Sequence, residues 1–302
     1  MNFQPGLPQG IERLEPRAPA TGPFARPAFL AAVTELTGEA VATVSDDATA
    51  LVVVSAGGEV RLAGDSDLTD YHCPLGSEVK SAVACLVDTA SPGTRFRFDS
   101  LPGEAADEIV DAFAATGLRA TSVRHAVTAV VDISAGYDAY LDAIGKKQRH
   151  EVRRKRRRYE DEVGDLIHEV HHAHDWALEE FFRLHRLSAG DKGEFMTAEH
   201  ERFFRTLAAQ EGWRIDVLRM PGEDRATATL FSYVDDEGVY LYNSAYDPAL
   251  RDASPGVAIV GSMIEQACHE GVPRFDFLKG DEVYKFRLGA HERPLYEVVA
   301  RK

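Results

Sequence analysis

Residues 238–277 read GVYLYNSAYDPALRDASPGVAIVGSMIEQACHEGVPRFDF, and this stretch decides the fold class. Its two ends, 238–245 and 274–278, are apolar runs that are typical of strands in a buried sheet. Between them, the apolar residues of 256–270 recur with a helical period and fall on one side. The order of strand, loop, helix and strand predicts an α/β fold in which the helix packs on a sheet.

The loop before this helix has the composition of a phosphate site. Free backbone N–H groups at a helix N-terminus, together with the positive end of the helix dipole, favour a pyrophosphate. The small residues Ser254 and Gly256 let the backbone approach phosphates, and Pro255 fixes φ where a helix begins. An ordinary helix cap after a loop is the alternative interpretation of the same residues.

The rest of the second half alternates helices and strands around this stretch. Residues 213–219, 225–234 and 238–245 predict three successive strands in an antiparallel meander. Ser134 and Asp175 are expected to cap helices, and Gly145 to end one. The other elements expected here are helices at 135–144, 146–159, from 175 onward and at 198–211, and strands at 166–172 and near 295–300.

The first half also mixes helices and strands, without a catalytic motif. Gly57 and Gly58 separate two apolar runs of 40–62, which indicates a hairpin, whereas 79–87 fits either a helix or a strand. The two halves share no residue-level repeat, but their similar alternation suggests a duplicated architecture with one degenerate copy. We therefore expect a mixed α/β chain of two domains, 1–128 and 129–302. The remaining expected elements are helices at 26–36 and 101–116 and strands at 94–98 and 126–133.

Composition limits the partners and the compartment. The net charge of −15 argues against general binding to nucleic acids or anionic membranes. Three cysteines without a CxxC spacing suit a reducing compartment, and the first residues lack the apolar run of a signal peptide. No stretch approaches the roughly twenty apolar residues that span a bilayer. We expect a cytoplasmic protein that is not inserted in a membrane.

Two segments resemble one family. Arg251 to Gly256 resembles the coenzyme A loop of GNAT acetyltransferases, Arg/Gln-x-x-Gly-x-Gly/Ala, with Ser254 in place of the first glycine. Residues 274–287, RFDFLKGDEVYKFR, look like the C-terminal part of CelD-like acetyltransferases, a GNAT branch with a buried DF strand, a glycine, an acidic residue and a Tyr-Lys pair. That branch resembles the FemABX aminoacyltransferases, which have two GNAT-like domains. The pairs Asp70-Tyr71 and Pro74-Leu75 and the basic run that begins at Lys146 agree with it.

The resemblance implies two tandem GNAT-like domains, the first degenerate, and transfer of an acyl group, expected to be acetyl, from acyl-CoA to a small-molecule or peptide amine. It implies no metal. Asp276 or Glu282 would act as the base or position the acceptor, and Tyr284 would act as the acid, with Tyr242 and Tyr246 as alternatives. The expected cofactor contacts are Tyr242, Arg251, Ser254, Gly256 and Val257, and the expected anion contacts include Lys285 and Arg287. Ordinary structural roles are the alternative for each.

Nine cations fall between Lys146 and Arg158, the densest charge in the chain. We expect anion contacts from Lys147, Arg149 and Arg153, to the 3′-phosphate of coenzyme A, to an anionic acceptor or to a transfer RNA. A solvated, salt-bridged helix face is the alternative, because acidic residues follow at 160–162.

Two rival functions remain open. A FemABX-like transferase would take its donor from aminoacyl-tRNA, although the acidity of the chain counts against binding of transfer RNA. A catalytically inactive GNAT-fold binding protein would explain the missing first glycine of the coenzyme A loop.

Other catalytic patterns are weaker. His168, His171, His172 and His174 alternate along a predicted strand, so we expect surface histidines rather than a metal site. Cys268 lies in a predicted core helix, which suits a small buried residue better than a nucleophile. The GxSxG elbow of hydrolases is absent.

Overall fold

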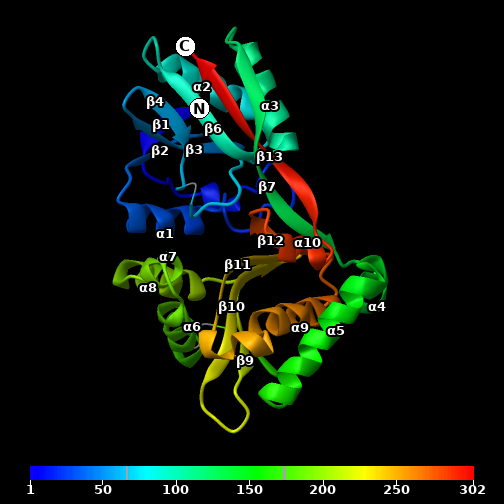
Figure 1. Ribbon diagram of the computed structural model, residues 1–302. Helices are drawn as coiled ribbons and strands as arrows, with labels where there is room; N and C mark the ends of the chain where they lie inside the picture. The colour runs from blue at the N-terminus through cyan, green and yellow to red at the C-terminus, as the bar shows by residue number, and fades with distance from the viewer. Residues whose placement is uncertain (66, 173–174) are drawn as a thin grey trace. The chain divides into compact units, whose positions relative to one another are not determined.

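The computed structural model describes residues 1–65, 67–172 and 175–302 (Figure 1). Contacts divide the chain into two compact units, which we treat separately. Unit 1 contains Met1–Thr128 and Arg293–Lys302, and unit 2 contains Ala129–Glu292. The domain predicted at 129–302 differs from unit 2 in the last ten residues, because they belong to a strand that pairs within unit 1.

Unit 1 is a sheet with helices on both faces. Its strand order is β1-β2-β3-β4-β6-β13. Alternate residues of β3 separate the faces: Leu51 and Val53 pack with α2 and α3, whereas Val52 and Val54 pack with α1. The elements are β1 (Asn2–Pro5), η1 (Ile11–Arg13), α1 (Pro27–Thr37), β2 (Val41–Ser45), β3 (Thr49–Ala56), β4 (Glu59–Leu62), β5 (Leu75–Gly76), α2 (Val79–Thr89), β6 (Arg95–Pro102), α3 (Gly103–Ala115), most of β7 (Ala120–Asp132) and most of β13 (His291–Arg301).

Unit 2 has the same layered design, with strand order β12-β11-β10-β9-β8 and the end of β7 beside β12. Consecutive residues of β10 again separate the faces: Leu230 packs in the cluster under α9, and the ring of Phe231 lies 5.6 Å from that of Phe181 in α6. The elements are α4 (Tyr137–Ala143), α5 (Gly145–Glu162), β8 (Ile167–His171), α6 (Asp175–Leu187), α7 (Asp191–Phe195), α8 (Ala198–Ala208), β9 (Trp213–Arg219), β10 (Ala226–Asp235), β11 (Gly238–Tyr246), η2 (Pro248–Ala253), α9 (Pro255–His269), β12 (Arg274–Lys279) and α10 (Val283–Arg287).

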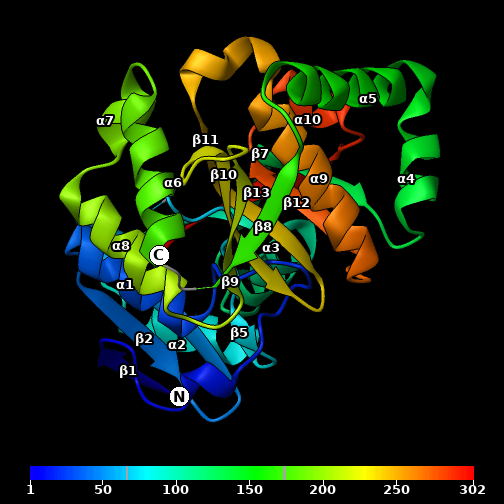
Figure 2. The same ribbon diagram turned by 90° about the horizontal axis from the view of Figure 1, so that it is seen from below.

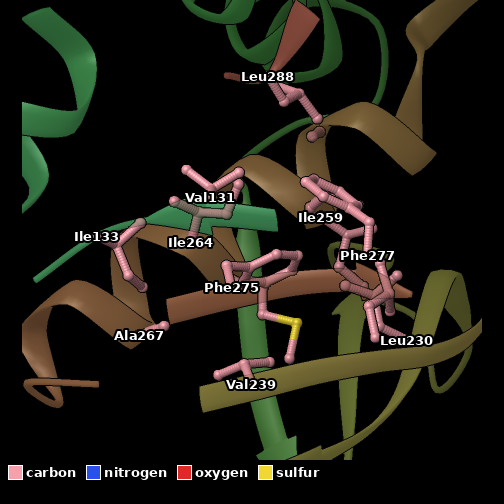
Figure 3. Close-up of a cluster of buried hydrophobic side chains, with 14 of the residues drawn as sticks. Val131, Ile133, Leu230, Val239, Ile259, Ile264, Ala267, Phe275, Phe277 and Leu288 are labelled. Atoms are coloured by element: carbon pink, nitrogen blue, oxygen red, sulfur yellow. The ribbon is translucent and has the colours of Figure 1, made fainter. Parts of the chain in front are cut away.

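The core of unit 2 holds α9 against the sheet. Figure 3 shows Ile259, Ile264 and Ala267 of α9 facing Phe275 and neighbouring strand residues. Burial of large apolar side chains such as Ile259, Ile264 and Phe275 stabilises the fold by roughly 1.5–3 kcal/mol each. The apolar period read from the sequence therefore orients α9, and with it the loop at its N-terminus.

The two units repeat one topology. In unit 1, β2-β3-β4 form an antiparallel meander, and β6 follows α2 and pairs in parallel with β4. In unit 2, β9-β10-β11 form the meander, and β12 follows α9 and pairs in parallel with β11. The mixed α/β fold is confirmed, and the strand pairings show the duplicated architecture that the sequence suggested.

Most elements lie where the sequence predicts them, and the differences are local. Residues 79–89 form the helix α2, whereas the sequence alone allowed either a helix or a strand at 79–87. Ser134 is not the cap of α4: its backbone and hydroxyl both bond to Asp132, and Gly136 holds the cap position. The short elements α7, η2 and α10 are not predicted, because helices of five or six residues have too few apolar positions to show a period.

Candidate functional site

The parallel pair β11 and β12 opens at its C-terminal end. The strands pair at Val239↔Phe275 and Tyr240↔Asp276. Beyond this point β11 continues to Tyr246 and β12 to Lys279, with no further pairing among the described residues. Backbone groups of β11 after Tyr240 are thus available on the side that faced β12.

The helix α9 begins beside this opening. Ser254 has φ 60° and ψ 45°, the left-handed conformation that glycine adopts most easily. The residue that departs from the GNAT loop therefore keeps a glycine-like backbone. A Cβ on Gly256 would lie 3.2 Å from the ring of Tyr246, so a larger side chain there would press on that ring. The N–H groups of Val257 and Ala258 both donate to the Ser254 carbonyl, which leaves fewer free donors than the sequence analysis expects.

A pocket of about 340 Å³ lies against this helix start and is lined by residues of α5 and α10. Figure 2 shows where these helices lie. Lys147, Glu151 and Lys155 line it at a spacing of four residues, so they share one face of α5. Arg154 pairs with Glu151 at 2.7 and 2.8 Å, which neutralises the acidic member of this face. The remaining lining residues are Gln148, Val152, Val257, Tyr284, Arg287 and Leu288. The pocket therefore combines apolar walls with cations, as a phosphate-bearing ligand requires.

The turn after β12 is held by one buried lysine. Only 3% of Lys285 is exposed, and its Nζ donates to the carbonyl of Lys279 at 2.7 Å and lies 2.9 Å from the Glu282 carboxylate. The carbonyl of Leu278 lies at 3.5 Å. These partners occupy the donors of Lys285, so we correct the predicted anion contact: this residue positions the turn that carries Tyr284.

Gly280 makes this arrangement possible. It has φ 117°, and a Cβ at this position would lie 2.3 Å from Oε2 of Glu282 and 2.9 Å from Nζ of Lys285. The expected base Glu282 thus lies in the turn with its carboxylate paired to Lys285, and 58% of its side chain is exposed.

Asp276 lies below the opening and is fully buried. Its Oδ1 accepts from the backbone N–H of Leu278 at 2.7 Å, where the chain turns with φ 61°. The pocket is lined by other residues. Glu282 does not line it either, but 58% of its side chain is exposed, so it is the more accessible of the two carboxylates.

Tyr284 lines the pocket with 40% of its surface exposed. Burial of its hydroxyl, and secondarily the charge of Glu282, raises the pKa of Tyr284 to about 12. The phenol is therefore protonated at neutral pH and serves as a hydrogen-bond donor rather than as a base.

The other predicted residues are dispersed. Tyr242 contacts the aromatic cluster of Trp213, Phe203 and Phe204, on the opposite face of the sheet from α9, so it is not a neighbour of Val257. Arg149 turns back to Asp142 and to the carbonyl of Leu141, which removes it from the pocket.

Two predicted cations remain exposed. Arg251 lies in η2, just before the helix start, and Arg153 lies on α5 outside the pocket lining. Neither has an ion pair within the part of the chain that the structure describes.

The histidines of this segment have different partners, and the prediction that all of them lie on the surface is wrong for His168. His168 is not a surface histidine: its Nε2 lies 2.7 Å from buried Asp216, and the Ser262 hydroxyl lies 3.0 Å from its Nδ1. His171 contacts Glu169, and His172 contacts the Trp213 carbonyl. His174 lies outside the described residues. No group of three potential metal ligands gathers within the described ranges.

Sequence reasoning missed several lining residues. The sequence does not distinguish four of them from the rest of the charge run: Gln148, Glu151, Val152 and Lys155. The four-residue spacing of Lys147, Glu151 and Lys155 could have separated one face of the helix from the others.

One protein-family model covers the segment that contains most of this candidate site. A model described as an acetyltransferase (GNAT) domain matches residues 146–286, which include α5, the splayed strands, α9 and α10. This segment is therefore similar to GNAT acetyltransferase domains. The finer resemblance to the CelD-like branch stays a prediction. No curated protein sequence matches the chain.

Solved structures share the fold across nearly the whole chain. A conserved protein of unknown function from Bacteroides thetaiotaomicron VPI-5482 superposes with a TM-score of 0.64 at 13% identity, over 97% of this chain and 94% of that one. FemX gives a TM-score of 0.62 at 10% identity, over 98% and 97%. The C-terminal domain of a putative lysylphosphatidylglycerol synthetase from Agrobacterium fabrum gives 0.62 at 15% identity, over 90% and 86%. At these identities the likeness concerns the fold alone.

No helix of the described segments is both long enough and apolar enough to cross a bilayer.

Proposed function

We propose that the GNAT domain transfers an acyl group, most simply acetyl, from acyl-CoA to the amine of a small molecule or peptide. The observation that supports this best is the end of β11–β12 pairing at Tyr240↔Asp276 beside the start of α9. A thioester placed there has backbone donors for its carbonyl oxygen and a cation-lined pocket for its phosphates. The three cysteines are free, which fits the proposed reducing, cytoplasmic setting.

The proposed chemistry divides between backbone and side chains. N–H groups of β11 beyond Tyr240 stabilise the oxyanion that forms when the amine attacks the thioester carbonyl. The C–S bond then breaks, and the protonated Tyr284 donates a hydrogen bond to the departing thiolate. The exposed oxygen of Glu282 positions the amine and accepts its proton, while Lys285 fixes the carboxylate. Lys147 and Arg287, which line the pocket, balance the phosphate charge.

Calorimetric titration with acetyl-CoA and desulfo-CoA tests the donor class. We expect micromolar binding by the wild type and at least a thirtyfold loss, roughly 2 kcal/mol, in Val257→Trp, which fills the pocket wall. Val283→Trp is the matched control, because Val283 is 62% exposed on α10 and does not line the pocket. Absence of binding by folded wild type at high micromolar ligand would contradict the proposal.

A second candidate donor is aminoacyl-tRNA, and a specific feature of α5 favours it. Four exposed residues lie one turn apart on α5 and form no ion pair within the described residues: Lys146, His150, Arg153 and Arg157. Such a stripe suits a nucleic-acid backbone. Binding of transfer RNA that weakens steeply with salt and is lost on Arg153→Glu and Arg157→Glu would support this donor, and absence of binding in low salt would exclude it. If the protein binds neither acyl-CoA nor transfer RNA, the catalytically inactive binding protein becomes the favoured function.

A further inference from the structure

The helices α5 and α9 lie side by side in a fixed register (Figures 1 and 2). A Cβ on Gly261 would lie 3.8 Å from Val152, and Nη1 of Arg156 lies 2.8 Å from Glu265. In both pairs the partner on α9 follows the partner on α5 by the same number of residues. Moving toward the C-terminus of one helix therefore also moves toward the C-terminus of the other, so the two helices run in the same direction. The same offset places Val257, near the start of α9, level with Gln148 and hence beside Lys147.

The pocket wall on α5 therefore carries positive charge at two separated levels. Lys147 lies at the level of the α9 start, and Lys155 lies eight residues further, about 12 Å along the axis at 1.5 Å per residue. Glu151 lies between them and is neutralised by Arg154. Neither lysine forms an ion pair among the residues that the structure describes. The pKa of Glu151 is lowered chiefly by its hydrogen bond to Arg154 and to a smaller degree by the charge of Lys155. One anion at the helix start would use only the first of these levels.

We infer that this wall recognises two anionic groups of the donor, with Lys147 contacting the diphosphate at the start of α9 and Lys155 contacting the 3′-phosphate of the coenzyme A ribose. This inference rests on the proposed function and specifies its donor. A lysine ammonium binds a phosphate as a point charge, and a phosphomonoester dianion attracts it more strongly than a diester. The site consequently selects donors with a 3′-phosphate, and Lys155 determines that selectivity.

The test compares acetyl-CoA with 3′-dephospho-acetyl-CoA by calorimetry. We expect the wild type to bind acetyl-CoA about tenfold more tightly, the effect of one charge-assisted contact of about 1.4 kcal/mol. Lys155→Met should remove this preference by weakening acetyl-CoA alone. Lys147→Met should weaken both ligands by a similar factor. Lys146→Met, which removes a cation on the neighbouring residue outside the pocket lining, should change neither.

The outcomes separate the two claims. If the wild type binds neither ligand, the proposed function fails. If it binds both equally, or if Lys155→Met weakens both equally, the acyl-CoA site stands and the recognition of a 3′-phosphate is wrong. Both lysines are at least partly exposed, so we expect the variants to fold as the wild type does. Circular dichroism and thermal melting of each variant test this.

Discussion

The ends of the two parallel strand pairs differ although their topology is the same. In unit 1, β4 and β6 pair at Glu59↔Arg95 and Val60↔Phe96, and in unit 2, β11 and β12 pair at Val239↔Phe275 and Tyr240↔Asp276. Each pair is preceded by a meander and connected by one helix, and each stops after two residues. The same opening is thus built twice.

In unit 1 the chain itself closes this opening. The loop after β4 returns to β6, where the His72 N–H donates to the Ser100 carbonyl at 3.0 Å and its Nδ1 lies 2.8 Å from Asp99. His72 is buried, and the cavity beside it is only about 10 Å³. A volume of that size holds about one water molecule.

In unit 2 the corresponding loop turns directly into α9 through Ser254-Pro255-Gly256, and a pocket of about 340 Å³ remains. The opening is therefore a property of the fold, whereas a ligand site at the opening depends on the loop that follows the first strand of the pair. We therefore propose that only unit 2 binds the donor and that unit 1 is the degenerate copy.

The largest predicted effect concerns the turn that keeps unit 2 open. Lys285→Met leaves the Lys279 carbonyl and the Glu282 carboxylate without their buried partner, so we expect unfolding free energy to fall by about 3 kcal/mol. Urea denaturation measures this change. Lys147→Met, a pocket cation without an ion pair in the described chain, should cost almost nothing. Equal stability of the two variants would show that Lys285 does not hold the turn.

The next prediction compares equivalent backbone positions. Phe275 and Arg95 are the first residues of β12 and β6 in the two parallel pairings. The residue five positions later has a positive φ in both units: 117° at Gly280 and 56° at Ser100. Gly280→Ala should destabilise the protein by about 2 kcal/mol, since the new Cβ meets Glu282 and Lys285. Gly271→Ala is the control, with φ 77° and open space around it, and should cost less in thermal unfolding. If Gly280→Ala and Gly271→Ala lose the same stability, the contacts of the new Cβ at position 280 cost little energy.

A smaller effect is expected at the start of α9. Ser254→Gly relieves a left-handed conformation and should raise the unfolding free energy by about 0.5 kcal/mol, after the entropy cost of glycine. Acetyl-CoA affinity should be kept or improved. Ser254→Ala retains Cβ and should bring no gain, so a gain with alanine would contradict the backbone explanation.

The smallest predicted effect is spectroscopic. The pKa of Tyr284 is raised from 10.0 to about 12 by burial, so the folded state retains this proton while the unfolded state loses it. The resulting stability is complete below pH 10 and is lost as the pH rises toward 12. The absorbance difference at 295 nm between wild type and Tyr284→Phe should therefore show a midpoint near pH 12. A midpoint near 10 would remove the basis for a protonated donor.

The sequence predicts the fold well and the site only in part. The meander of β9, β10 and β11 and the helix α9 are predicted because their apolar residues repeat with the period of each element. The start of α9 at the Ser254-Pro255-Gly256 loop is predicted, whereas the glycine-like backbone of Ser254 is not, because serine stands where the coenzyme A loop has its first glycine. These signals are local, so they are present in a single stretch of residues.

The missed features depend on contacts between distant residues. Lys285 is held by the carbonyl of Lys279 in the preceding turn. Tyr242 lies away from the pocket because it packs against side chains of α8 and β9. Lys155 reaches the pocket because of the register between α5 and α9, which no local pattern encodes. The closure of unit 1 by His72 likewise joins a loop to a strand 27 residues away.

Hydrogen–deuterium exchange with and without desulfo-CoA tests most directly whether one opening binds the donor and the other does not. We predict ligand-dependent protection of residues 241–258 and 278–288 in unit 2 and no change at 60–80 and 95–102 in unit 1. Protection of the unit 1 segments, or of neither unit at saturating ligand, would contradict the account.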